Sequence, residues 1–281
     1  MALPRDLVVL DTETTGAPPG ARLVEIGALR IRGRAVAERF SALIFPECPI
    51  PPEVVRVHGI TDRDVADAET AAEVLPRFLA WCGDRPLLAH NAAFDAAMIA
   101  AECVRLRLPV PENRVLCTLR ASRRLLRRRS HSLENLVRDL GLPPSRHHRA
   151  LDDAGHAWRL ALHLLESAGE EELAAALGRG RPLASYAPDR PRSSGRIGFL
   201  LDAADRGEAL DIDYLLRDQR LVPLRVTPRF LFRRGSSLIM EAFCHRDRHY
   251  KSYRVDRVVR AHACPDAAPA EVRRPTARGG I

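Results

Sequence analysis

The chain has 281 residues, of which 46% are hydrophobic and 28% charged; this composition is typical of a globular protein of one or two domains and excludes a disordered or fibrous chain. The chain has no apolar run of about 18 residues and no signal peptide at its start, so we expect a cytoplasmic protein without a membrane partner. The net charge of +8 favours a nucleic-acid partner.

The first 165 residues change from strand-like to helix-like periodicity. Three apolar or alternating runs predict consecutive, antiparallel strands at Leu7–Leu10, Val24–Ile31 and Arg34–Ile44. Helical spacing of apolar residues follows, interrupted by two short buried strands. The predicted helices are Ala71–Cys82, Ala92–Leu106, Leu119–Leu126, Leu133–Leu140 and Ala150–Leu165, and the predicted strands are Pro86–Ala89 and Val115–Cys117. This order predicts an α/β domain over residues 1–166, with a mixed sheet flanked by helices.

A second, mostly β unit follows a stretch rich in Gly and Pro. Residues 167–195 predict a linker with one short helix at Glu170–Leu177. Residues 196–264 predict one helix and several strands, enough for a single small barrel or sheet. The helix is Ile197–Ala204, and the strands are Leu210–Leu215, Leu221–Phe232, Leu238–Cys244 and Tyr250–Val259. Residues 265–281 predict a disordered tail.

Positive charge is concentrated near the C-terminal end. Residues 1–165 hold 23 Arg against 20 acids, a net charge of +3, whereas residues 191–281 hold 17 Arg and Lys251 against 11 acids, a net charge of +7. The basicity therefore predicts a second nucleic-acid contact in the C-terminal unit rather than a property of the first domain.

Two acidic residues follow the first predicted strand. Asp11 and Glu13 are two residues apart, so on a strand they face the same side. Two carboxylates held this close repel each other unless a cation lies between them. Mg²⁺ and Mn²⁺ prefer carboxylate oxygens. A solvated strand end explains the bare spacing equally well.

Another acidic residue follows the predicted strand Pro86–Ala89. Asp95 lies in the first turn of the helix Ala92–Leu106, within the string His90-Asn91-Ala92-Ala93-Phe94-Asp95. An Asp at a helix start is also favoured by the helix dipole alone, so Asp95 by itself leaves both interpretations open.

Two histidines and two aspartates surround the start of the last helix of this domain. The possible pairs are His147 with Asp152 and His148 with Asp153. On the helix, Asp153 lies beside the apolar stripe, whereas Asp152 shares a face with His156 that we expect to be solvated. This favours Asp153 as the inward carboxylate and His148 as its companion.

In this order, the three motifs resemble the DnaQ-like, DEDDh-type 3′→5′ exonucleases, a family that includes the proofreading epsilon subunit of bacterial DNA polymerase III. The resemblance covers about residues 6–165 and implies a ribonuclease H-like fold. Further matching strings are Val24-Glu25-Ile26-Gly27-Ala28, Val57-His58-Gly59-Ile60-Thr61, Cys117-Thr118-Leu119-Arg120, Ser132-Leu133-Glu134-Asn135-Leu136 and His148-Arg149-Ala150-Leu151.

The resemblance implies roles for nine residues. The four carboxylates that match the family's ligands of two divalent cations, Mg²⁺ or Mn²⁺, are Asp11, Glu13, Asp95 and Asp153, and His148 matches its general base. By position, the pocket for the terminal nucleotide is matched by Thr14, His58, Asn91 and Phe94. Core packing of Phe94, and loop capping by His58 and Asn91, remain alternatives.

The implied activity is release of 5′-mononucleotides from single-stranded or frayed 3′ ends of DNA, in proofreading, repair or DNA processing. RNA is an alternative substrate, and a DNA polymerase is an alternative partner. A non-catalytic nucleic-acid or ligand sensor is an alternative of another class. The convergence of four carboxylates and a histidine favours the enzyme.

A run of arginines lies near the predicted active site. It consists of Arg123, Arg124, Arg127, Arg128 and Arg129. A patch that binds the nucleic-acid backbone and a solvated helix end are both compatible with it.

The C-terminal unit resembles a WYL domain, a family with Sm-like or SH3-like β barrels that is associated with ligand or nucleic-acid sensing. The resemblance depends on Ile212-Asp213-Tyr214, Arg225-Val226-Thr227-Pro228, Glu241-Ala242-Phe243-Cys244-His245 and Tyr253-Arg254-Val255-Asp256-Arg257-Val258. The name-giving Trp-Tyr-Leu triplet is replaced by Leu238-Ile239-Met240. The implied binding residues are Arg225, Arg229, Arg246, Arg248, Arg254 and Arg257. A structural barrel with a solvated basic surface is the alternative.

Overall fold

The computed structural model describes residues 3–143, 149–264 and 270–275, in two compact units. The first unit comprises Met1–Pro46 and Ile50–Ala187, and the second Glu47–Pro49 and Pro188–Ile281. Within the described ranges, no helix is both long enough and apolar enough to cross a membrane. Most of the tail predicted at residues 265–281 lies outside these ranges.

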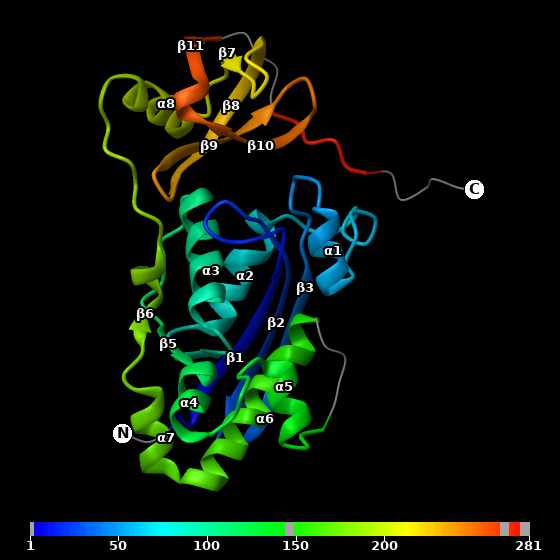
Figure 1. The fold of residues 1–281 in the computed structure, drawn as a ribbon, viewed down its shortest axis with the longest axis vertical. Coiled ribbons are helices and arrows are strands. Elements are labelled where there is room, and N and C mark those ends of the chain that lie inside the picture. Colours follow the sequence, from blue (N-terminus) through cyan, green and yellow to red (C-terminus); the bar gives the residue numbers. More distant parts are fainter. Residues whose placement is uncertain (1–2, 144–148, 265–269, 276–281) are drawn as a thin grey trace, which may run out of the picture. The chain divides into compact units, whose positions relative to one another are not determined.

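The first unit is built on a six-stranded mixed sheet (Figure 1). Its strands are β1 (Asp6–Thr14), β2 (Leu23–Arg32), β3 (Ala35–Leu43), β4 (Leu87–Ala89), β5 (Arg114–Cys117) and β6 (Arg181–Pro182), in the spatial order β3-β2-β1-β4-β5-β6. Strands β1, β2 and β3 are antiparallel neighbours, whereas β4 runs parallel to β1 and β5 parallel to β4. Strand β1 therefore has a hydrogen-bonded neighbour on each side.

Helices cover both faces of this sheet, as the sequence predicts. They are α1 (Pro52–His58), α2 (Ala71–Cys82), α3 (Ala93–Arg105), α4 (Thr118–Leu125), α5 (Leu133–Asp139), α6 (Ala150–Ala168) and α7 (Glu170–Leu177). The α/β class and the mixed sheet are confirmed. Helix α1 is not among the helices predicted from the sequence; it begins with proline, which is well tolerated in the first turn of a helix.

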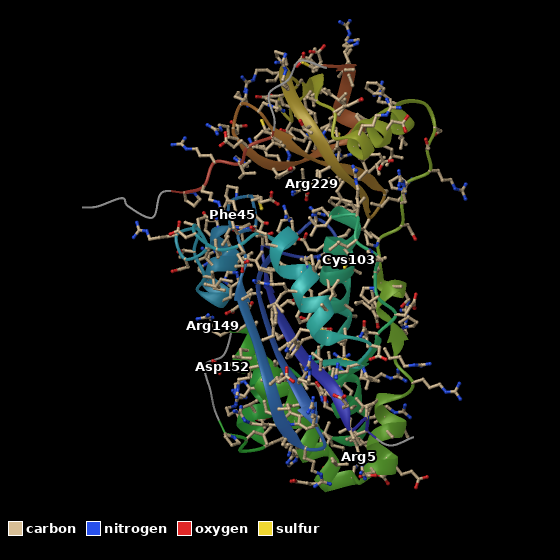
Figure 2. The ribbon with its side chains drawn as sticks, turned by 180° about the vertical axis from the view of Figure 1, so that it is seen from behind. Arg5, Phe45, Cys103, Arg149, Asp152 and Arg229 are labelled. Atoms are coloured by element: carbon tan, nitrogen blue, oxygen red, sulfur yellow. The ribbon has the colours of Figure 1, made fainter. Side chains whose placement is uncertain are left out.

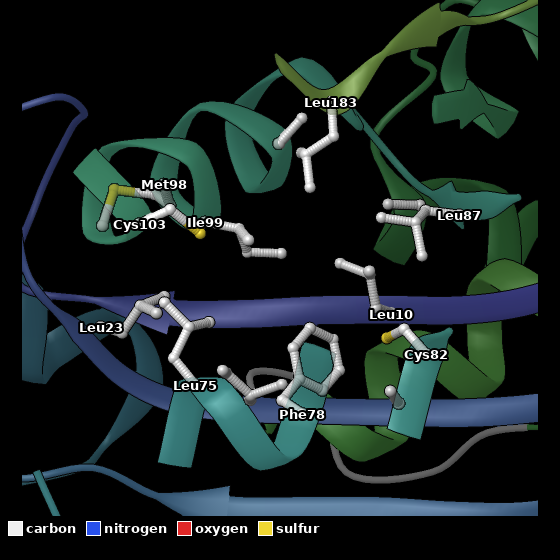
Figure 3. Close-up of a cluster of buried hydrophobic side chains, with 14 of the residues drawn as sticks. Leu10, Leu23, Leu75, Phe78, Cys82, Leu87, Met98, Ile99, Cys103 and Leu183 are labelled. Atoms are coloured by element: carbon white, nitrogen blue, oxygen red, sulfur yellow. The ribbon is translucent and has the colours of Figure 1, made fainter. Parts of the chain in front are cut away.

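Alternate residues of β1 contribute to two separate cores. Val8 and Leu10 pack with Phe78 of α2 and Ile99 of α3 (Figure 3). Val9 faces the other way and packs with residues of α4, α5, α6 and α7. Because side chains alternate along a strand, β1 can be apolar throughout only when both faces of the sheet are covered. Its continuous apolar run is explained by this arrangement.

Phe78 is the largest apolar side chain in the first of these cores, and its exposed fraction is 0%. Its ring lies 5.2 Å from that of Phe40, centroid to centroid. We expect Phe78→Ala to lower the free energy of unfolding of this unit by roughly 3–5 kcal/mol, because a cavity remains where the ring was. Urea denaturation followed by circular dichroism measures this loss. Val57→Ala, at a side chain that is 55% exposed, is the control and should change stability by about 0.5 kcal/mol or less.

The stretch predicted as a linker, residues 167–195, lies partly on the first unit. The predicted helix is present as α7, and its residues Leu173 and Leu177 are buried in the second core. Strand β6 then pairs with β5, and a 3-10 helix at Leu183–Tyr186 buries Leu183 in the first core (Figure 3). Gly169 and Gly178 of this stretch have positive φ and end the helices α6 and α7.

In its described residues, the second unit is an antiparallel sheet with one α-helix, as predicted. Helix α8 (Gly195–Arg206) precedes the strands β7 (Leu210–Leu215), β8 (Leu221–Arg234), β9 (Ser237–Cys244), β10 (His249–Arg254) and β11 (Val258–Ala263). Their spatial order is β10-β9-β8-β7-β11. Leu200 of α8 packs with Val226, Met240 and Val258 of the sheet in one core. The unit thus buries its own apolar residues.

Candidate active site

Three carboxylates converge where β1 and α6 meet. Asp11 and Glu13 lie near the end of β1, and Asp153 lies in the first turn of α6. A carboxylate oxygen of each lies within 4.8 Å of an oxygen of the others. Asp152, the alternative to Asp153, is half-buried and does not belong to this group. Of the two neighbouring aspartates, the buried Asp153 therefore lies with Asp11 and Glu13, and Asp152 does not.

Asp95 approaches the same carboxylates from the other face of the sheet. It is 3% exposed, and its Oδ1 accepts a hydrogen bond of 2.8 Å from Oγ1 of Thr12. Its charge acts on both Asp11 and Glu13. Asp95 does not belong to the group whose oxygens lie within 4.8 Å of one another. Helix α3, which carries Asp95, packs on one face of the sheet and α6 on the other, so only the folded sheet brings Asp95 near the other three acids.

Burial raises the pKa values of Asp11, Glu13 and Asp95, and repulsion by neighbouring carboxylates adds to this effect at Asp11 and Glu13. The pKa of Asp11 lies well above its usual value, because its carboxyl is buried and then because Asp95 and Glu13 are close. Burial, followed by the charge of Asp153, raises the pKa of Glu13 to about 8. Burial raises the pKa of Asp95 to about 7, against the opposing effect of the hydrogen bond from Thr12. The group has a deficit of positive charge, which protons or cations can supply.

The ligand atoms in this group suit hard divalent cations. All of them are carboxylate oxygens, which Mg²⁺ and Mn²⁺ prefer, whereas zinc more often takes sulfur or imidazole ligands. The raised pKa values of Asp11 and Glu13 also favour a cation site, because a cation between these acids would offset their repulsion. The residues present therefore fit a divalent metal site.

The two histidines considered as general base, His147 and His148, lie outside the described residues. A third histidine corrects the sequence interpretation. His156 was expected on a solvated face, but it is completely buried, and its Nδ1 lies 3.2 Å from Oδ1 of Asp153. A period of 3.6 residues gives only the direction of a side chain from its helix, and helices α4, α5 and α7 pack around α6 as well.

The four residues predicted for the nucleotide pocket have different surroundings. Thr14 is buried, and its hydroxyl donates to the carbonyl of Gly16 at 2.7 Å. His58 ends α1, is buried, and accepts a hydrogen bond from the backbone of Ile60. Asn91 is exposed, with φ of 61°, in the turn between β4 and α3. Phe94 is half-buried and packs partly on the core, so its ring is only partly available for a ligand.

Glu25 and Arg149 belong to this neighbourhood, although sequence reasoning assigned neither of them a role. Glu25 of β2 pairs in register with Glu13 of β1. Its carboxylate is only 2% exposed and accepts hydrogen bonds from Arg149, at the start of α6. The sequence feature that could have identified both residues is their place in two of the short strings that match the exonuclease family.

The arginine run beside α4 is exposed along its whole length, at Arg123, Arg124, Arg127, Arg128 and Arg129. If it binds phosphates, the double change Arg127→Glu and Arg129→Glu should weaken DNA binding and reduce the slope of log K against log salt by about 1 per lost contact. Binding titrations at several salt concentrations measure this. Arg77→Glu, an exposed change on α2, is the control. An unchanged slope would show that the run is only a solvated helix end.

The predicted binding arginines of the second unit are mostly paired with acids. The pairs are Arg225 with Asp211, Arg229 with Glu241, Arg246 with Asp247, Arg248 with Glu271 and Arg254 with Asp256. A groove of about 690 Å³ is lined by Arg254 together with Arg196 and Arg233, which sequence reasoning did not name. Leu238, in place of the family's Trp, lines it too. Because these acids offset the charge of the arginines, the second unit presents less unpaired positive charge than the net charge of +7 of residues 191–281 suggests.

Comparison with known proteins agrees with both resemblances. Residues 8–160 match the Exonuclease (RNase_T) family, and residues 197–263 match the WYL domain. A putative bifunctional exonuclease/endonuclease protein of Mycobacterium tuberculosis is 40% identical over 174 residues, which cover 58% of this chain and 27% of that protein. The PolC-type DNA polymerase III of Thermotoga maritima is 38% identical over 160 residues, 57% of this chain and 12% of that polymerase.

The chain thus spans between 12% and 27% of the length of these two relatives. Among solved structures, exonuclease X in complex with 5′ overhanging duplex DNA is 30% identical, with a TM-score of 0.50. That match covers 61% of this chain and 99% of exonuclease X. The match to the exonuclease family includes more than half of the chain and all four acids of the site. This protein therefore belongs to the Exonuclease family of DnaQ-like nucleases and carries a WYL domain C-terminal to its nuclease domain in the sequence.

Proposed function

We propose that this protein is a 3′→5′ exonuclease that depends on two divalent cations and releases 5′-mononucleotides from DNA in the cytoplasm. The observation that carries the proposal is the convergence of Asp11, Glu13 and Asp153 within 4.8 Å in a chain of the Exonuclease family. Residues 1–166 would carry the chemistry. Residues 196–264 would supply a second contact with nucleic acid, through the groove that Arg196, Arg233 and Arg254 line.

Each acid has a distinct place in the proposed mechanism. Asp11, Glu13 and Asp153 would hold the cations directly, and Asp95, whose carboxylate is oriented by Thr12, would complete the set. When bound, Mg²⁺ or Mn²⁺ ions supply positive charge against the scissile phosphate and acidify a water molecule. His148 would accept the proton of the attacking water, since a histidine with the unperturbed pKa of about 6.5 is a suitable base at neutral pH.

The substrate we propose is DNA with an accessible 3′ end. Exonuclease X, whose sequence is 30% identical, was solved with duplex DNA that has a 5′ overhang, and hence a recessed 3′ end. The exposed Asn91 and the half-buried Phe94 shortly precede Asp95 in the chain, so we propose their amide and aromatic ring as contacts for the last nucleotide. Thr14 and His58 would line the same pocket. The similarity to a PolC-type polymerase makes a polymerase partner a further proposal.

The experiment that tests this function uses the full chain and four substrates. These are 5′-labelled single-stranded DNA, matched duplex, duplex with a 3′ mismatch, and RNA, each with Mg²⁺ and with EDTA. We expect stepwise shortening of the labelled DNA from its 3′ end with Mg²⁺ only. Faster shortening of RNA would change the substrate class to RNA. No shortening of any substrate, with binding retained, would favour the non-catalytic sensor over the enzyme.

A further inference from the structure

Helix α6, which presents Asp153, begins without a capping side chain of its own. Its N-cap residue is Arg149, which makes no capping hydrogen bond, although Ser, Thr, Asp or Asn usually fills this position. The backbone N–H of Ala150 instead donates to Oε2 of Glu25 at 3.0 Å. A negative charge at a helix N-terminus is also favourable. A strand residue 125 positions earlier therefore caps this helix.

The same carboxylate holds Arg149. Nη2 of Arg149 lies 2.7 Å from Oε1 of Glu25, and Nε lies 3.1 Å from Oε2. The two parallel hydrogen bonds fix the relative orientation of the two groups, as a lysine ammonium would not. Figure 2 labels Arg149 and Asp152 at this start of α6. Both oxygens of Glu25 are thus occupied by donors from the start of α6, which leaves this carboxylate poorly placed to bind a cation as well.

A glycine of β2 brings the helix against the sheet. A Cβ atom at Gly27 would lie 2.0 Å from the backbone N of Leu151 and 2.2 Å from the backbone C of Ala150. Atoms cannot approach this closely, so any side chain at Gly27 would displace the start of α6. In the β1–β2 register, Gly27 is the partner of Asp11 and Glu25 is the partner of Glu13. The helix therefore contacts β2 at the two residues that face the acids of β1.

We propose that Glu25, Arg149 and Gly27 form a docking clamp that sets the position of Asp153 relative to Asp11 and Glu13. Glu25 and Arg149 are then positioning residues for the proposed metal site rather than ligands or phosphate contacts. The proposal rests on the proposed function, because it assigns these residues to the same site. Its physical basis is that three points of contact hold the first turn of α6, one turn or less from Asp153.

The test uses full-length Arg149→Ala, Arg149→Lys and Glu25→Gln variants, with Arg77→Ala as a matched control in an exposed ion pair. Three quantities are measured: Mn²⁺ affinity by calorimetry, kcat and KM on 5′-labelled single-stranded DNA, and the melting temperature. We expect Arg149→Ala to bind Mn²⁺ roughly 10- to 100-fold more weakly. Its kcat should fall by roughly 100-fold, with KM changed by less than about twofold.

The conservative variants separate positioning from general loss of structure. Arg149→Lys keeps the charge but only part of the hydrogen bonding, so its Mn²⁺ affinity should lie between those of the wild type and Arg149→Ala. Glu25→Gln keeps an acceptor for the N–H of Ala150 and should lie between them too. Arg77→Ala should match the wild type in all measurements. If Arg149→Ala does not fold, the comparison of Arg149→Lys with the wild type decides.

Two results would overturn the clamp. Unchanged Mn²⁺ affinity and unchanged kcat in all clamp variants would show that the contacts only stabilise the fold. A higher KM and a smaller salt dependence, with Mn²⁺ affinity unchanged, would show that Arg149 binds phosphate instead. Wild-type protein that binds Mn²⁺ but degrades nothing would contradict the proposed function, while the calorimetry would still test the clamp.

Discussion

Replacing Asp11 by Asn is expected to lower the Mg²⁺-dependent degradation of DNA by at least roughly 10²–10³-fold. The oxygens of Asp11 lie within reach of those of both Glu13 and Asp153, so the change removes charge from the centre of the group. A neutral amide binds Mg²⁺ less well than a carboxylate. The rate of release of nucleotides from a labelled 3′ end, at saturating Mg²⁺, measures the effect.

The same variant should make the metal-free protein more stable. Burial and the neighbouring carboxylates raise the pKa of Asp11, so its ionised form is unfavourable in the folded chain. Asn removes that repulsion and keeps the shape, so the melting temperature in EDTA should rise while activity is lost. Asp152→Asn, one residue from Asp153 but outside the group, should leave both quantities near wild type. A lower melting temperature and retained activity in Asp11→Asn would contradict the proposed site.

The metal-free protein is also expected to lose stability as the pH rises from about 4 to about 8. The pKa of Glu13 is raised from 4.5 to about 8 and that of Asp95 from 3.8 to about 7, so the folded state holds protons that the unfolded state has released. A raised folded-state pKa gives a contribution that is fully present below the unfolded value and lost as the pH passes the folded value. Between its unfolded-state and folded-state pKa, each such group lowers the free energy of unfolding as the pH rises.

Divalent cations should reverse this trend. Metal ions compete with the protons on Glu13 and Asp95, so the rise in melting temperature on adding Mn²⁺ should be small at pH 5 and large at pH 8. Thermal unfolding at four pH values, with Mn²⁺ and with EDTA, measures both trends. The Asp11→Asn variant is the control, because it should show a weaker response to Mn²⁺ at every pH. If the rise in melting temperature with Mn²⁺ is independent of pH, the carboxyls of Glu13 and Asp95, whose pKa values are raised, do not take part in binding Mn²⁺.

Several features of the site follow from local sequence. Strand geometry places Asp11 and Glu13 on one side of β1, and helical geometry selects Asp153 over Asp152. Each of these inferences depends only on the periodicity of one element and on where its apolar residues lie. The α/β order of the first unit and the β character of the second follow from the same periodicities.

Other features depend on contacts between elements distant in the chain, which periodicity does not describe. The periodicity of β2 predicts only that the side chain of Glu25 is buried. In the structure, its carboxylate caps a helix that begins 125 residues later. His156 was expected in solvent and is buried, because helices from elsewhere in the chain pack around α6. The arginines of the second unit were candidates for phosphate contacts, and the sheet places acids such as Asp211 beside them.

The sequence by itself therefore determined the fold class and the family and named the candidate acids of the site, since these depend on residue types and their spacing. Only the tertiary structure decided how the acids are arranged: Asp95 approaches from the α3 face, Asp153 from the α6 face, and Glu25 serves the helix instead of joining them. The physical reason is that ionised carboxyls repel one another. Whether each is ionised, and whether it can bind a cation or a hydrogen-bond donor, depends on the groups that the fold places next to it.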